Sequence, residues 1–290
     1  MGAPSTSHKF CLKGGYLPLA SGWAAVTVHE PEGAEAKGDV ICLYPLGEER
    51  KAAYRFFMEL ANRLSGGGWR VLRIDYAGYG SNPHEHTELT FEHTSRLVHE
   101  LATTWGKSEN LCLVGLRWGA DLALHCCSEY DLTCRLVLVE PVLKGSVYLE
   151  ELRRRRDVQL ALGRQSEMTK LPKNEMDGED FFGFPFSACF CRELSEWDAI
   201  ARLERLHEEC EGLFLHLAAR PALTGLWAQL AAIPLRGMTV AALRHRPVWG
   251  SAEYFDTTTI QEVIHEYIEF SPERFEAALT ERGGVLASAD

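Results

Sequence analysis

Residues 111–122 read LCLVGLRWGADL, and this stretch carries the clearest local signal in the sequence. Its apolar first four residues predict a buried strand, and the small and apolar residues at its end predict the start of a helix. Between them, Gly115 and Gly119 let the chain turn sharply because they add no side-chain bulk. The stretch therefore predicts a strand, a tight turn and a helix, with the cation Arg117 at the middle of the turn.

The alternation of strand and helix recurs along the chain. Residues 51–64 and 90–105 carry apolar side chains at helical spacing. Alternating strands and helices indicate a mostly parallel sheet with helices on its faces. Phe10–Leu19 precedes the next run without a helix between them, so we expect an antiparallel strand at the sheet edge. Seven further apolar runs are predicted strands: Trp23–Val28, Val40–Tyr44, Arg70–Asp75, Leu111–Gly115, Arg135–Glu140, Leu213–Ala218 and Met238–Leu243.

Residues 143–210 interrupt this alternation. They contain the basic run Arg153–Arg156 and the aromatic stretch Phe181–Phe186, and they are too long for one crossover helix. We expect a mainly helical cap inserted over the carboxyl ends of the strands, between core parts 1–142 and 211–290. The basic run should be the exposed side of a cap helix. The inward residues of that helix are expected to be Leu149, Leu152 and Leu160.

The composition excludes several classes of function. The formal net charge of −11 is the wrong sign for a general nucleic-acid binder, which needs a basic surface. No apolar run approaches the roughly 20 residues that span a bilayer, and the N-terminal residues show no secretory pattern. The nine cysteines are scattered and lack the paired spacing of a zinc site. We therefore expect a cytoplasmic protein with reduced thiols and without a metal or cofactor.

Ligands of open parallel sheets bind outside the carboxyl ends of the strands. Residues just beyond those ends are therefore the candidates for a binding or catalytic site. Carboxylates and histidine there could transfer protons, whereas an arginine, backbone N–H groups and aromatic rings could hold a ligand. The candidate site residues are Gly47, Glu48, Arg117, Trp118, Glu140, His245 and Trp249.

The order and spacing of these pieces resemble the α/β-hydrolase superfamily over roughly residues 20–270. A closer resemblance is to the exosortase-A-system-associated hydrolases of the second type. That family has a G-L-R-x-G turn, an acid-rich P-x-x-E-E loop, a Q-P-V-like strand end and a P-F-W segment. The similar segments here are Gly115–Gly119, Pro45–Glu49, Glu140–Val142 and Pro247–Trp249. The resemblance implies an α/β-hydrolase fold, a hydrolase-like site and a link to cell-surface polysaccharide or protein-sorting loci.

The residues of a serine hydrolase are incomplete in this sequence. Such enzymes need a nucleophile at the turn, an acid after a later strand and a histidine after the last strand. Arg117 cannot attack a substrate because its guanidinium stays protonated. Arg220 stands where the acid is common, although Glu140 could serve as an alternative acid. His245 follows the last predicted strand but has no nucleophile beside it.

Two roles are open for Arg117. It could be a buried structural ion pair, or it could hold an anionic ligand, since the start of a helix also favours negative charge. One guanidinium could serve both roles, pairing with an acid when no ligand is bound. The acids that could hold it are Glu48, Glu49, Asp75 and Glu140.

Two functions from different classes follow. The first is a hydrolase-like pseudoenzyme that binds a small anionic ligand (a carboxylate or a phosphate) or an acyl-type substrate through Arg117. The alternative is a hydrolase or transferase acting on an ester or acyl substrate without a triad, with Glu48, Glu140 or His245 transferring protons. The missing serine favours the first function, whereas the intact pocket segments keep the second open.

Overall fold

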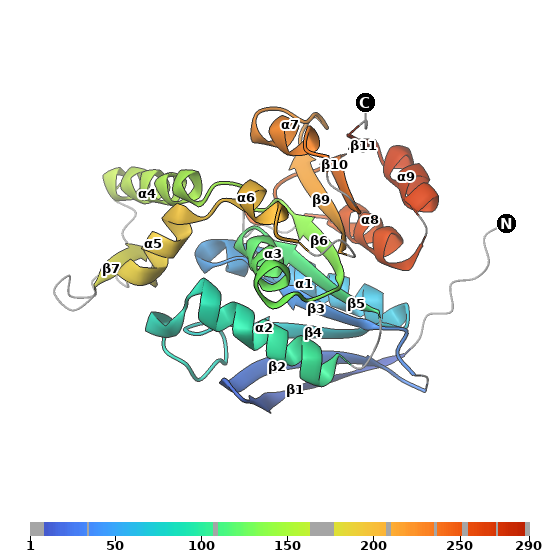
Figure 1. Cartoon of the computed structure of the whole chain (residues 1–290), viewed down its shortest axis with the longest axis horizontal. Helices are drawn as coiled ribbons and strands as arrows, with labels where there is room; N and C mark the ends of the chain where they lie inside the picture. Colours follow the sequence, from blue (N-terminus) through green and yellow to red (C-terminus); the bar gives the residue numbers. More distant parts are fainter. Residues whose placement is uncertain are drawn as a thin grey trace.

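The computed structural model describes most of the chain, namely residues 9–33, 35–106, 110–162, 177–206, 210–234, 237–250, 255–270 and 272–287. One large sheet forms the centre of this part of the molecule (Figure 1). Its strands are β1 (Phe10–Leu19), β2 (Gly22–Pro31), β3 (Asp39–Leu43), β4 (Arg70–Asp75), β5 (Leu111–Leu116), β6 (Arg135–Val139), β9 (Glu211–Ala218), β10 (Met238–Arg244) and β11 (Val285–Leu286).

The sheet has the spatial order β1-β2-β4-β3-β5-β6-β9-β10-β11. The neighbours from β4 to β10 are parallel, whereas β1 and β2 form an antiparallel hairpin at one edge and β11 is antiparallel at the other. The central strands are buried along most of their length, as expected for strands covered on both faces. The predicted mostly parallel sheet and its antiparallel edge strand are confirmed.

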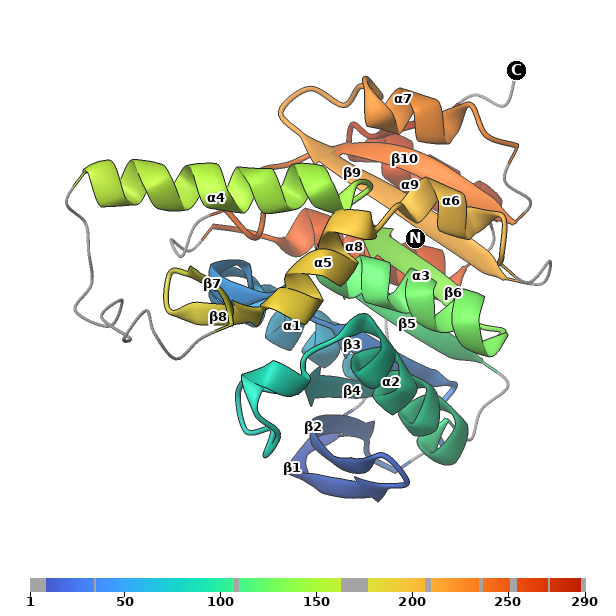
Figure 2. The ribbon, with the colours of Figure 1, turned by 60° about the vertical axis from the view of Figure 1, so that its left-hand side comes forward.

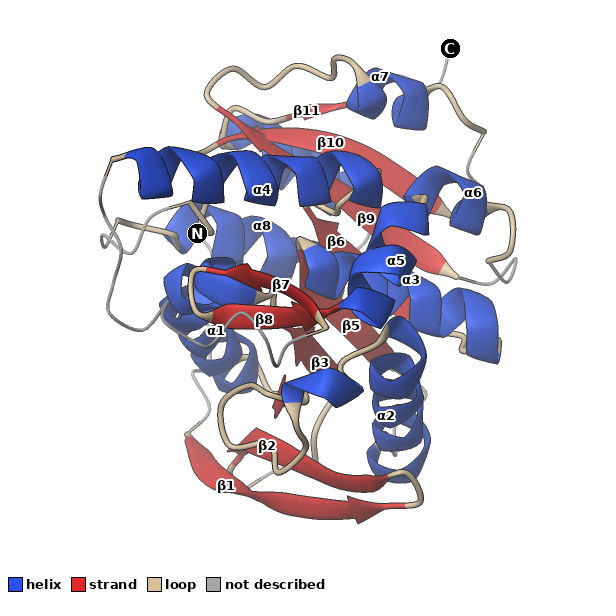
Figure 3. Cartoon of the chain, turned by 90° about the vertical axis from the view of Figure 1, so that its left-hand side faces the viewer, coloured by secondary structure: helices blue, strands red, loops and turns tan. Residues whose placement is uncertain are grey.

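Helices cover both faces of the sheet, as predicted. Figure 3 shows α1 and α8 on one side and α2 and α3 on the other. Among the described residues, no helix is both long and apolar enough to cross a bilayer. The helices outside the segment between β6 and β9 are α1 (Gly47–Gly66), the short 3-10 helix η1 (His86–Glu88), α2 (Phe91–Trp105), α3 (Trp118–Tyr130), α7 (Leu226–Ala231), α8 (Thr258–Glu269) and α9 (Pro272–Glu281).

Most of the segment between β6 and β9 lies at one end of the sheet, and its last helix lies beside α3 (Figures 1 and 2). The segment is not only helical, because a two-stranded hairpin accompanies the helices. Part of the stretch expected as cap, residues 163–176 and 207–209, lies outside the described residues. The elements of this segment are α4 (Gly145–Ala161), β7 (Gly178–Phe181), β8 (Phe184–Ser187), α5 (Ala188–Glu196) and α6 (Ala199–Leu203).

Helix α4 projects beyond the body of the sheet (Figure 2). Leu149 and Leu152 near its start are buried, as expected from the sequence. Leu160 near its end is 45% exposed, so the expectation that it faces inward is wrong. The outer half of the helix extends past the residues that could cover it, and helical periodicity alone does not reveal where the packing partners end.

One buried acid ties this segment to the sheet domain. The Oδ2 atom of Asp121, in the first turn of α3, accepts a hydrogen bond from the backbone N–H of Val142 at 2.8 Å. Its Oδ1 atom accepts one from the indole Nε1 of Trp197 at 3.0 Å. Burial raises the pKa of the Asp121 carboxyl well above its ordinary value, and the two hydrogen bonds act against that rise. Val142 precedes α4 and Trp197 follows α5, so one side chain holds both ends of this part of the segment.

Candidate functional site

The turn between β5 and α3 has a strained backbone. Arg117 at its centre has φ 53° and ψ −127°, a conformation that L-residues rarely adopt. The two flanking glycines are packed against backbone. A Cβ atom on Gly119 would lie 2.1 Å from the carbonyl oxygen of Leu43, and one on Gly115 would lie 2.3 Å from the oxygen of Gly119. This sharp strand-to-helix turn is the geometry that presents a nucleophile at the end of a hydrolase sheet.

The Arg117 side chain is held by an acid from α1. Its Nε donates a hydrogen bond to Oε2 of Glu49 at 3.3 Å, and the hydroxyl of Tyr148 donates to the same oxygen at 3.1 Å. The guanidinium carbon lies 5.1 Å from the ring centre of Tyr148 and 5.0 Å from that of Trp249. Arg117 is only 9% exposed and Glu49 only 3%. The two residues therefore form a buried ion pair enclosed by aromatic rings.

Two charged residues of α4, Glu151 and Arg155, form a group of four charges together with this pair. Arg155 approaches the other oxygen of Glu49, with an Nη1–Oε1 distance of 3.7 Å, and it also pairs with Glu151. Glu151 in turn lies 3.9 Å from Nη2 of Arg117. Burial by itself lowers the pKa of Arg117, but the negative charge of Glu49 and its neighbours raises the pKa above its ordinary value. Arg117 is therefore a permanent cation.

Most hydrogen-bond donors of Arg117 are not used. A guanidinium has five N–H donors, and here only Nε has an acceptor within hydrogen-bond distance among the described residues. The Oε1 atom of Glu49 is likewise buried without a hydrogen bond in the described part of the chain. The pair therefore keeps binding capacity for a further molecule, most directly at the two terminal nitrogens of Arg117.

A cavity of about 660 Å³ adjoins this pair, between the start of α1 and the outer half of α4. Glu49 and Trp249 line the cavity and also contact Arg117, so the guanidinium lies directly behind the cavity wall. The lining includes more cations than acids, although the whole chain has a formal net charge of −11. The cations in the lining are Lys51, Arg154 and Arg155, and the acids are Glu48 and Glu49.

Gly47 and Glu48 are close to the turn between β5 and α3, but their hydrogen-bond and ion-pair partners differ from those of Glu49. The N–H of Gly47 donates to the hydroxyl of Tyr79 at 3.2 Å, so this backbone donor already has a partner. The carboxylate of Glu48 pairs with Lys51 at 2.7 Å and is about half exposed. Glu48 borders the cavity, but the acid that holds Arg117 is Glu49.

Trp118 lies in the core. Its side chain is fully buried, with its ring centre 5.2 Å from that of Tyr76 and 5.4 Å from that of Phe91. Only its backbone, at the start of α3, belongs to the turn that carries Arg117. Trp249, by contrast, lines the cavity and covers the guanidinium, as a ligand-binding residue would.

The structure does not bring Glu140 and His245 together. Glu140, at the end of β6, has φ 47°, and its Oε1 lies 2.6 Å from Nδ1 of His216 on β9. His245 instead places its ring nitrogens 2.7 Å and 3.2 Å from the carbonyl oxygens of Arg246 and Asp256. The sequence analysis missed His216, which stands in an apolar strand without any local signal of a site.

Comparison with solved structures places this geometry in a known fold. Neither a protein-family model nor a curated protein matches the chain. Proline iminopeptidase from Mycobacterium smegmatis is similar with a TM-score of 0.61 and 16% identity, over 92% of this chain and 100% of that one. The enol-lactonase from Burkholderia xenovorans LB400 is similar with a TM-score of 0.58 and 14% identity, over 88% of this chain and 99% of that one.

The chain has the α/β-hydrolase fold. An esterase from Exiguobacterium antarcticum agrees with this assignment, with a TM-score of 0.56 and 16% identity over 89% of this chain and 100% of the esterase. At such low identity the likeness establishes the architecture alone. In an α/β-hydrolase fold the turn between β5 and α3 is the nucleophile elbow, and Arg117 is its central residue.

Proposed function

We propose that this protein binds a small anionic ligand, a carboxylate or a phosphate with an apolar portion, at the former active site of an α/β-hydrolase and does not hydrolyse it. One observation carries the proposal: the two terminal nitrogens of Arg117 make no hydrogen bond to the described residues, and they lie behind the wall of a cavity whose lining has more cations than acids. Residues 143–210 then act as the cap of this cavity. The shared G-L-R-x-G turn supports a place beside the second-type exosortase-associated hydrolases.

The chemistry of binding follows from the placed charges. Lys51, Arg154 and Arg155 attract the anion into the cavity. Its head group accepts hydrogen bonds from the terminal nitrogens of Arg117, whose planar fork matches two oxygens at once. The positive end of α3 adds to this attraction. Nε stays paired with Glu49, so Arg117 is at the same time a structural ion pair and an anchor.

Several features speak against ester hydrolysis at this turn. An arginine supplies no nucleophile, and the Gly47 N–H, which would help to stabilise an oxyanion, is already donated to Tyr79. Both ring nitrogens of His245 lie against backbone carbonyl oxygens, and the described residues give its ring no hydrogen bond to a carboxylate of the kind that a triad needs. The nucleophile is therefore replaced, and the Gly47 N–H and the His245 ring nitrogens have other partners.

The alternative function, a hydrolase or transferase on an ester or acyl substrate, has one observation in its favour. Glu140 orients the imidazole of His216 across 2.6 Å, which is the arrangement that prepares a histidine for proton transfer. This pair could activate water without a covalent intermediate. Among the cavity-lining residues named above neither partner appears, so this alternative ranks second.

We expect the purified protein not to react with serine-directed fluorophosphonates and not to cleave simple aryl esters above the uncatalysed rate. The physical reason is the absence of a nucleophile at the elbow. The measurement is labelling followed by mass spectrometry, together with an absorbance assay in which a known serine esterase is the positive control. Turnover that is proportional to protein concentration and is lost in His216→Ala would favour the alternative function.

We expect anions with an apolar tail to stabilise the protein more than matched neutral molecules. Octanoate and phenyl phosphate would be compared with octanamide and phenol in thermal unfolding. A ligand at a hundred times its Kd adds about 2.7 kcal/mol, which raises Tm by roughly 4 °C in a chain of 290 residues. Arg117→Lys should reduce the shift, because lysine keeps the charge and lacks the fork.

The matched control is Arg153→Ala. Arg153 is also on α4, but it pairs with Glu179 and does not line the cavity. This variant should retain the wild-type ligand shift. Equal shifts with the charged and neutral compounds, or an unchanged shift in Arg117→Lys, would refute anion binding through Arg117.

A further inference from the structure

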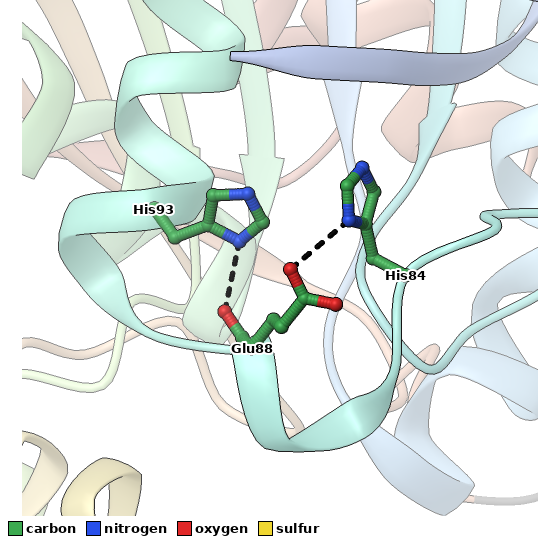
Figure 4. A group of neighbouring side chains, drawn as sticks. All are labelled: His84, Glu88 and His93. Carbon is green, nitrogen blue, oxygen red and sulfur yellow. Dashed lines mark hydrogen bonds and ion pairs between the residues drawn. The ribbon is translucent and has the colours of Figure 1, made fainter.

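Three potential metal ligands lie together outside the cavity, in the connection between β4 and α2. His84 comes from the loop, Glu88 from η1 and His93 from the first turn of α2. Each offers one ligand atom, and these atoms all lie within 4.8 Å of one another. Figure 4 shows both imidazole rings and the carboxylate facing one another. The closest pair, Nδ1 of His84 and Oε2 of Glu88, is 3.0 Å apart.

Two of the three side chains are oriented by a backbone contact. Nδ1 of His93 lies 2.8 Å from the carbonyl oxygen of Glu88, which can only accept, so His93 carries its proton there and its Nε2 keeps a lone pair. Oε1 of Glu88 accepts the N–H of Glu85 at 3.1 Å, which leaves Oε2 directed at His84. A histidine that donates its second nitrogen to a carbonyl is the usual outer contact of a metal ligand.

A simple ion pair accounts for only part of this arrangement. The contact between His84 and Glu88 could be an exposed pair four residues apart, worth little on its own. It does not explain why His93 joins the group, with its ring 5.4 Å from that of His84 and its tautomer fixed by Glu88 itself. Two imidazoles and one carboxylate within a ten-residue stretch form a set of nitrogen and oxygen ligands.

We propose that His84, Glu88 and His93 bind a divalent transition-metal ion, with Zn²⁺ as the best match. Two imidazoles favour Zn²⁺ and its neighbours over Mg²⁺ or Ca²⁺, which prefer oxygen ligands. In a tetrahedral zinc site with bonds of about 2.0–2.1 Å the ligand atoms are about 3.4 Å apart. We expect side-chain rotations to bring the ligand atoms, which now lie within 4.8 Å of one another, to that spacing. A water molecule takes the fourth position, because only three protein ligands are present in the group.

The position of this site suggests what the ion does. The loop that carries it packs against the segment between β6 and β9. Tyr79 stacks on Phe184 of β8 at 5.7 Å, and the N–H of Phe91 donates to Glu193 of α5 at 2.9 Å. A metal ion would therefore fix the platform on which β8 and α5 rest. This effect on the loop is independent of whether the cavity binds an anion.

The test is titration of the full-length, chelator-stripped protein with ZnCl₂ by isothermal calorimetry. We expect one Zn²⁺ per chain, and we expect His93→Ala and Glu88→Gln each to weaken binding by at least roughly tenfold. Glutamine keeps an oxygen for the N–H of Glu85, so Glu88→Gln should preserve the local fold. His86→Ala is the matched control, because His86 is in the same short helix and outside the group.

A second measurement separates this site from the cysteines. Co²⁺ at the proposed site should give a visible spectrum without a thiolate-to-metal charge-transfer band, since no sulfur is coordinated. The proposal is overturned if the wild type does not bind Zn²⁺, if His93→Ala and Glu88→Gln bind as tightly as the wild type, or if the Co²⁺ spectrum shows thiolate coordination.

Discussion

Arg117→Ala is expected to lower the free energy of unfolding by about 3–5 kcal/mol, because removal of one partner leaves a buried charge uncompensated. Glu49 is 3% exposed, and its remaining cation, Arg155, lies 3.7 Å away at the cavity edge. The loss would be measured by urea unfolding followed by circular dichroism. It is larger than for a surface pair because the carboxylate that remains is only 3% exposed, so water solvates it poorly.

A second substitution tests whether the loss of stability comes from the buried carboxylate of Glu49, which Arg117→Ala leaves without its partner. In Arg117→Ala/Glu49→Gln the charge of both partners is removed, and glutamine can still accept the hydrogen bond from Tyr148. The double variant should therefore be more stable than Arg117→Ala alone, and with Glu49→Gln as the third variant the cycle should give an interaction energy of roughly 1–3 kcal/mol. Arg153→Ala, which breaks an exposed pair with Glu179, should cost less than about 1 kcal/mol. A loss for Arg117→Ala as small as that of Arg153→Ala would show that the buried pair does not stabilise the fold.

Gly119→Ala is expected to cost at least about 3 kcal/mol or to prevent folding altogether. The added Cβ would lie 2.1 Å from the carbonyl oxygen of Leu43 and 2.6 Å from that of Tyr44. Both atoms are backbone at the end of β3, in the middle of the sheet, so they cannot move aside as a flexible side chain could. Soluble yield and thermal unfolding would measure the effect.

Gly14→Ala in the edge strand β1 is the control for this substitution. A Cβ atom there would meet nothing within 4 Å, so the expected change in stability is within about 0.5 kcal/mol. If Gly119→Ala unfolded at the same temperature as Gly14→Ala, the close approach of α3 to β3 would be wrong.

The fold could be predicted from the sequence because its strands are short, strongly apolar and separated by helical patterns. β4 was predicted with its observed bounds, and the elbow was predicted from Gly115 and Gly119. These signals are local, since burial on both faces of a strand is visible in the strand itself. The exposure of Leu160 near the end of α4 was not predictable, since it depends on where the neighbouring elements end.

The site was predictable only at its centre. Arg117 could be placed at the elbow, but the choice between Glu48 and Glu49 depends on which side of α1 faces the turn. The contacts that Tyr148 and Arg155 make with Glu49 depend on how α4 is positioned over the elbow. The sequence around these two residues is typical of a basic helix exposed to solvent. Contacts between distant segments leave no periodic trace in either segment.

The hydrogen bonds of Asp121 have a consequence for how the cavity discriminates among molecules. If the segment between β6 and β9 hinged open as a whole, the carboxylate would lose the Val142 N–H and the Trp197 indole together and remain in the core. Each lost bond would cost roughly 1–3 kcal/mol. We therefore expect ligands to enter and leave the cavity at the outer half of α4, where Val158 and Gln159 border it. Because Asp121 fixes both Val142 and Trp197, we expect an entrance at this place to keep its width and to exclude broad molecules, whatever their charge.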